Sequence, residues 1–200
     1  TNANASRNNI LEEFTQLVQN ANVGDTLFFS FSGHGIYTRD RNQDEQDGQD
    51  EMIVGADFRC IKDDELKSIL QRYLKKGVTL FTLFDNCHSG TVLDLRYQYL
   101  KNGEGSLIVH SNCVETEGQV ICLSGCRDNQ VSMDAYLDNT YNGAMTWALV
   151  ECLSSKTDGE LNWQACTNHI RNLLVSKGFR QKPQLTSGKQ FDLTQEIVSL

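Results

Sequence analysis

Apolar residues recur along the chain at two spacings, and each spacing predicts one kind of element. Intervals of three and four residues, typical of amphipathic helices, occur in four segments: 6–20, 61–74, 141–153 and 161–177. Short and nearly continuous apolar runs, typical of strands that a parallel sheet buries on both faces, occur in four others: 26–31, 52–56, 78–84 and 120–124. Helices and strands therefore both contribute to the fold.

The order of these elements indicates the fold class. A strand at 26–31, a helix at 61–74 and a strand at 78–84 form a βαβ unit, which requires a parallel sheet and a right-handed crossover. We therefore predict an α/β fold with a mostly parallel central sheet flanked by helices. A chain of 200 residues is long enough for one hydrophobic core, so we assign residues 1–200 to a single domain.

Two segments do not follow either spacing. Residues 39–51 contain six acidic side chains, and we predict a solvated loop there. Residues 101–118 have weak periodicity and several polar residues, and we predict a long exposed connection.

Charge and cysteine content narrow the range of partners. The chain carries 26 acidic against 18 basic residues, and without a basic stripe we expect neither nucleic acid nor an anionic membrane as a partner. Cations, either metal ions or basic peptides, fit this charge better.

Seven cysteines are an odd number without the spacing of a disulfide framework, which favours a reduced, cytoplasmic location. No apolar run reaches the length of a membrane span.

Reactive side chains follow two of the predicted strands. The run S-G-H-G follows strand 26–31 and contains His34, and the run D-N-C-H-S-G ends strand 78–84 and contains Cys87. A thiol needs a base to become an effective nucleophile, and neighbouring parallel strands end at the same edge of a sheet. We expect the fold to bring His34 beside Cys87, with the N–H groups of Gly35 and Cys87 placed to hold an oxyanion. Each residue alone is more often structural, as a turn histidine or a buried thiol, but their joint placement favours catalysis.

Several motifs together resemble those of the metacaspases, the caspase-like cysteine peptidases. The runs F-S-F-S-G-H-G and D-N-C-H-S-G-T-V-L-D-L resemble the two catalytic signatures of that family. Four further runs resemble other motifs of its large and small subunits: D-G-Q-D-E-M-I-V-G-A-D, I-K-D-D-E-L, S-G-C-R-D-N-Q-V-S-M-D-A and N-G-A-M-T-W-A-L. The resemblance implies a caspase-like three-layer sandwich. It divides the domain into a large-subunit part at about 1–100, a connecting loop at 101–118 and a small-subunit part at 119–200.

The resemblance also implies roles for individual residues. It makes His34 the general base and Cys87 the nucleophile of a cysteine endopeptidase. It places Ser32 and Asp85 in an acidic S1 pocket that accepts a substrate Arg or Lys. A carboxylate in a pocket pairs with a cation and repels an acidic side chain, although Asp85 is also suited to a structural role as a cap.

The chain departs from the family pattern in two places. Asn86 stands where the family commonly has a second cysteine, which is not the nucleophile. The family's first strand, first helix and second strand, with another S1 aspartate, have no counterpart within residues 1–200.

Acidic residues suggest a cation site. By the resemblance, Asp50, Asp63, Asp64 and Asp94 match positions that bind an activating Ca²⁺, and carboxylate oxygens suit that ion. Asp63 and Asp64 would equally suit the N-terminus of a helix without metal. A second pattern, with Asp40, Asn42, Asp44 and Glu51 at EF-hand positions, is weak because Glu45 replaces the required glycine.

The remaining expectations concern processing and alternative functions. The resemblance implies self-cleavage at or near the connection, where Arg96 and Lys101 offer basic P1 residues. It also implies polypeptide substrates, and we expect the protein to be a monomer. One alternative is a non-catalytic, calcium-responsive interaction protein, which intact His34 and Cys87 disfavour. The other is a legumain-like relative, which the Asp63, Asp64 and Asp94 set disfavours.

Overall fold

A six-stranded sheet forms the centre of the computed structural model, which describes residues 4–39, 49–86, 92–100, 107–125, 134–137, 140–155, 161–179 and 181–197. Its strand order is β1-β5-β8-β11-β6-β7. The strands are β1 (Thr26–Ser32), β5 (Thr79–Asp85), β8 (Gln119–Ser124), β11 (Gln184–Ser187), β6 (Tyr97–Tyr99) and β7 (Leu107–Val109). The first three are parallel, and β11, β6 and β7 pair with their neighbours in antiparallel fashion.

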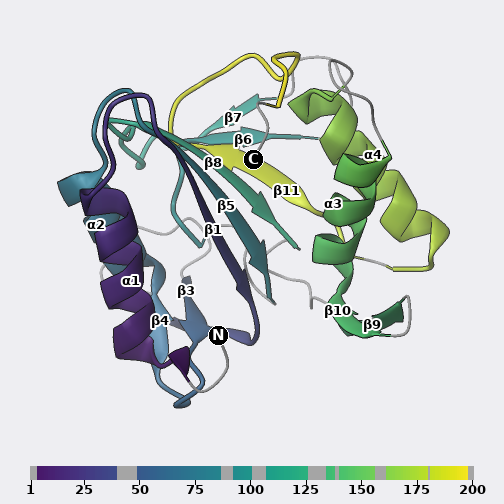
Figure 1. Cartoon of the computed structure of the whole chain (residues 1–200), viewed down its shortest axis with the longest axis horizontal. Coiled ribbons are helices and arrows are strands. Elements are labelled where there is room, and N and C mark those ends of the chain that lie inside the picture. The colour runs from purple at the N-terminus through teal and green to yellow at the C-terminus, as the bar shows by residue number, and fades with distance from the viewer. Residues whose placement is uncertain are drawn as a thin grey trace.

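Helices cover both faces of this sheet (Figure 1). On one face lie α1 (Arg7–Gln19) and α2 (Asp63–Tyr73), and on the other lie α3 (Ala144–Ser154) and α4 (Trp163–Ser176). Each helix pair buries its own cluster of apolar side chains against the sheet. The predicted α/β class, with helices on either side of a partly parallel sheet, is confirmed.

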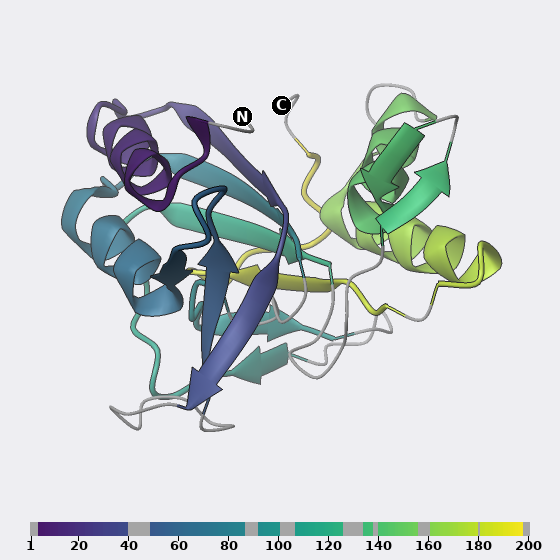
Figure 2. The same cartoon turned by 90° about the horizontal axis from the view of Figure 1, so that it is seen from below.

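Two small sheets lie outside the central one, and the apolar pattern predicted only one of their strands. One consists of β2 (Gly35–Arg39), β3 (Gln49–Val54) and β4 (Cys60–Lys62). The other is a hairpin of β9 (Asp134–Leu137) and β10 (Thr140–Gly143), which contacts α3 and lies beside it in Figure 2. Because β10 leads directly into α3, that helix begins three residues later than the spacing predicted.

Two local expectations were wrong, and a third was incomplete. The strand at 26–31 is not buried on both faces, because β1 is an edge strand whose burial alternates and whose Phe28 is 48% exposed. The end of the predicted solvated loop lies in β3, where Glu51 is fully buried. The connection at 101–118 contains β7, which pairs with β6 at the far edge of the sheet.

No helix in the described part of the chain is both long enough and apolar enough to cross a membrane.

Candidate functional site

The ends of β1 and β5 are level with each other at one edge of the sheet. Their parallel register pairs Ser32 with Asp85. His34 follows Ser32 by two residues, is exposed, and accepts a hydrogen bond on its backbone carbonyl from the N–H of Val54 (2.9 Å). Cys87 follows Asp85 by two residues in the sequence, but it lies outside the described residues, as does its backbone N–H. Of the predicted catalytic and S1 residues, the structure therefore describes four: Ser32, His34, Gly35 and Asp85.

Asp85 is buried, and its described hydrogen bonds come from helix α3. Its Oδ2 accepts from the backbone N–H of Thr146 (2.8 Å) and from the Thr146 hydroxyl (2.7 Å). The side chain is 4% exposed. Asp85 thus has a structural role at the start of α3, which differs from the cap of its own loop that the sequence suggested. Ser32, by contrast, is exposed at the end of β1.

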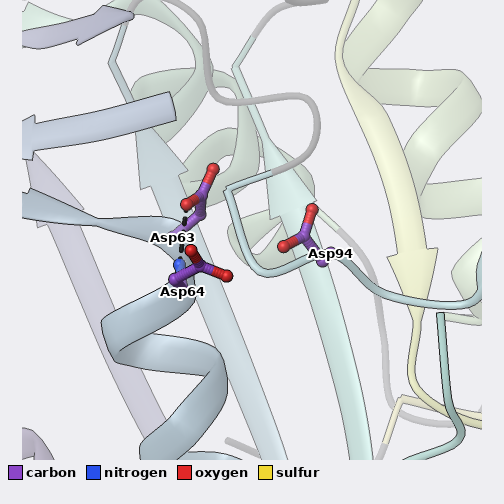
Figure 3. Close-up of side chains that lie close together, drawn as sticks. All are labelled: Asp63, Asp64 and Asp94. Carbon is purple, nitrogen blue, oxygen red and sulfur yellow. Dashed lines mark hydrogen bonds between the residues drawn. The ribbon is translucent and has the colours of Figure 1, made fainter. Parts of the chain in front are cut away.

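Three of the four predicted calcium ligands lie together. Asp63 and Asp64 open α2, and Asp94 lies on the chain segment opposite; Figure 3 shows the three carboxylates around one small space. One carboxylate oxygen from each lies within 4.8 Å of those of the other two. The fourth predicted ligand, Asp50, belongs to β3, but its side chain is outside the described residues.

The cluster concentrates negative charge where solvent screens it poorly. Asp63 is 1% exposed, and burial together with the negative charge of Asp94 raises its pKa to about 7. Hydrogen bonds from the backbone N–H groups of Asp64 (2.7 Å) and Glu51 (2.8 Å) oppose this rise. Lys67 Nζ lies 3.0 Å from Asp94 Oδ2 and supplies part of the compensating charge.

These residues fit a hard divalent cation. Carboxylate oxygens are the ligands that Ca²⁺ prefers, and two of the three groups are almost fully buried, where uncompensated charge is costly. Asp94 adopts a left-handed backbone conformation (φ 46°), which aspartate tolerates better than most residues. The helix N-terminus stabilises acidic residues by itself, but it does not account for Asp94, which is distant in sequence.

Sequence reasoning missed three residues of this region. Lys67 follows Asp63 by four positions, so a helix places both on one face, and that spacing was an available signal. Glu51 resembled a loop residue because several acids precede it. Thr146 lies in the run N-G-A-M-T-W-A-L, which resembles a family motif, but nothing in the sequence relates the start of α3 to the end of β5.

Comparisons with known proteins agree with these motifs. Residues 1–96 match the family model described as the metacaspase peptidase C14 domain. The chain is 33% identical to metacaspase-1B of Neurospora crassa over 94% of its own length and 54% of that protein. It is 36% identical to metacaspase-1 of Ajellomyces capsulatus over 89% of its own length and 62% of that protein. The chain thus spans between half and two thirds of the length of these relatives.

A solved structure supports the fold. The crystal structure of a Geobacter sulfurreducens protein matches 96% of this chain and 78% of its own with a TM-score of 0.69. At 24% identity the match concerns the fold alone.

Proposed function

This chain is a homologue of the metacaspases, and we propose that it is a cysteine endopeptidase that cleaves polypeptides after Arg or Lys. The observation that carries the proposal is the parallel register of β1 and β5. It makes Ser32 and Asp85 level, and His34 and Cys87 each follow two residues later. The two reactive side chains therefore belong to adjacent strand ends, where open α/β sheets hold their ligands.

The chemistry follows from these two residues. The His34 imidazole takes the proton of the Cys87 thiol, and the thiolate attacks the carbonyl carbon of the scissile bond. The N–H groups of Gly35 and Cys87 stabilise the oxyanion. The protonated imidazole then gives its proton to the leaving amine, which leaves an acyl-enzyme. Water, activated by His34, hydrolyses this thioester and restores the free thiol.

A basic P1 residue agrees with the charge near the strand ends. Asp85 carries a carboxylate two residues before the nucleophile, and Ser32 lies beside it in the register. Such a carboxylate attracts Arg or Lys and disfavours the Asp side chain that an acidic P1 would bring.

We further propose that calcium activates the enzyme through Asp63, Asp64 and Asp94, with Asp50 as a fourth candidate ligand. A bound calcium ion would supply the positive charge that relieves the repulsion between Asp63 and Asp94. The cluster joins the start of α2 to the chain segment that follows the Cys87 region, seven residues after the nucleophile. Calcium bound at Asp94 would therefore restrain a chain segment that is only seven residues from the nucleophile Cys87.

Fluorogenic peptides with Arg, Lys or Asp at P1 test the proposal. We expect hydrolysis of the Arg and Lys peptides in calcium, its loss in excess chelator, and none with Cys87→Ala or His34→Ala. Hydrolysis in chelator at the full rate would refute calcium activation alone. No hydrolysis of any peptide would favour a non-catalytic interaction protein.

Mixing active protein with Cys87→Ala tests self-processing near Arg96 and Lys101, because the variant should be cut only when the active protein is present.

Thiol labelling separates the nucleophile from the structural cysteines. Burial raises the pKa of Cys122 to about 11, and the neighbouring thiol of Cys152 together with burial raises that of Cys166. Thiols react as thiolates, so iodoacetamide at pH 7.5 should spare Cys122 and Cys166 in the native protein. It should also spare Cys152, which is fully buried. Labelling of Cys87 in parallel with loss of activity, followed by peptide mass spectrometry, would identify it as the reactive thiol.

A further inference from the structure

Helix α3 begins without a cap of its own. Its N-cap residue is Gly143, which has no side chain to accept a hydrogen bond from the first turn. Helices leave their first N–H groups unsatisfied, and an N-cap side chain normally accepts from the second or third residue. In this protein the acceptor for the third residue, Thr146, is Asp85 Oδ2 at the end of β5.

The local sequence is adapted to this arrangement. A side chain at Gly143 would clash with the Asp85 carboxylate, because a Cβ built there comes closer to Oδ2 than real Cβ atoms approach a neighbour. Thr146 adds a second hydrogen bond through its hydroxyl, to the same oxygen. Two donors from Thr146 therefore hold Oδ2, and the absence of a side chain at Gly143 lets the carboxylate approach.

We propose that Thr146 is a positioning residue for substrate recognition, which orients the Asp85 carboxylate toward the charge of a P1 Arg or Lys. This proposal rests on the proposed function and adds a residue from the C-terminal part of the chain to it. The two hydrogen bonds from Thr146 to Asp85 Oδ2 fix both the position of the carboxylate and its rotation about the Cβ–Cγ bond. A rotated carboxylate would still cap the helix through the backbone N–H but would meet the P1 cation in a poorer geometry.

The variant Thr146→Val tests this directly, because it removes the hydroxyl and keeps the branched shape and the backbone N–H. Thr146→Ser is the matched control, since it keeps the hydroxyl. For P1-Arg and P1-Lys peptides in calcium, we expect Thr146→Val to raise KM about tenfold, equivalent to about 1.4 kcal/mol, with a smaller change in kcat. The KM of Thr146→Ser should stay within about twofold of that of the unmutated enzyme. A rise in KM with little change in kcat reports lost substrate binding.

Active-site titration and thermal unfolding distinguish positioning from stability. A purely structural cap would lower Tm in Thr146→Val while KM per active site stayed unchanged, and that result would overturn the proposal. A change in kcat alone would also overturn it. If the unmutated protein hydrolyses neither basic peptide, the proposed function itself fails. If it hydrolyses them and both Thr146 variants match it, only the positioning role fails.

Discussion

The buried carboxyl of Asp63 should make the calcium-free protein less stable as the pH rises. Its pKa is about 7 in the folded state, against the ordinary value of 3.8 in the unfolded chain. Between these values the folded state holds a proton that the unfolded state has lost. Stability falls with pH wherever the folded state binds more protons. The contribution of Asp63 is therefore fully present below pH 3.8 and is lost as the pH rises through 7.

The structure sets the size of the effect. A shift from 3.8 to about 7 corresponds to about 4 kcal/mol, at about 1.4 kcal/mol for each pKa unit. Between pH 5 and pH 8 only the upper part of this window is crossed, which leaves about 2–3 kcal/mol. The cause is burial beside Asp94, so a calcium ion that neutralises both carboxylates should remove the penalty.

Urea unfolding followed by circular dichroism, in chelator at pH 5 and pH 8, measures the effect. Asp63→Asn removes the charge and keeps one oxygen that accepts from a backbone N–H. Other carboxylates titrate in the unmutated protein and in Asp63→Asn alike. The informative quantity is therefore the difference in unfolding free energy between these two proteins. We expect this difference to shift by about 2–3 kcal/mol in favour of the variant on going to pH 8.

Glu13→Gln, which removes an exposed carboxylate from α1, is the matched control and should show no such shift. If Asp63→Asn and the unmutated protein lose or gain stability in parallel between the two pH values, the carboxyl is not held in the environment described. Saturating calcium at pH 8 should stabilise the unmutated protein and leave Asp63→Asn largely unaffected.

Three further outcomes follow from described contacts. Lys67→Met should raise calcium affinity about tenfold in calorimetry, because the ion no longer competes with the ammonium at Asp94; Arg72→Gln, an equal charge change on the exposed side of α2, should leave affinity unchanged. Gly143→Ala should cost about 1–3 kcal/mol in urea unfolding and clearly less in an Asp85→Ser background, whereas equal costs would exclude a clash with that carboxylate. A chain cut between residues 100 and 107 should elute as one species in gel filtration, and release of either fragment without denaturant would contradict the sheet order.

The candidate site could be proposed from the sequence because its residues lie next to strong local signals, and the pairing of His34 with Cys87 stays a prediction. His34 and Cys87 follow apolar runs, His34 stands between two glycines and Cys87 lies three residues before Gly90. Neighbouring parallel strands end at the same edge of a sheet. The proposed cation site was suggested by the family resemblance and not by the local pattern. Asp63 and Asp64 alone would have been assigned to a helix N-terminus.

What could not be predicted depends on which elements become neighbours. The run at 26–31 is apolar enough for a central strand, yet β1 lies at an edge and Phe28 is half exposed. Edge and central strands differ in their neighbours, which a single strand's sequence does not encode. The same limit applies to Thr146, whose partner Asp85 is 61 residues away in the chain.

The sheet order explains why a cut in the connection need not separate the two parts of the domain. Strands β1, β5 and β6 precede residues 101–106, and β7, β8 and β11 follow them. In the sheet they interleave, because β8 pairs with β5 while β11 lies between β8 and β6. Each fragment therefore contributes a strand that lies between two strands of the other fragment. The apolar cluster under α3 and α4 likewise contains Tyr99 from the first fragment and Leu185 from the second. Separation would break three ladders and open that core, so the Asp85–Thr146 contact across the two parts should survive cleavage.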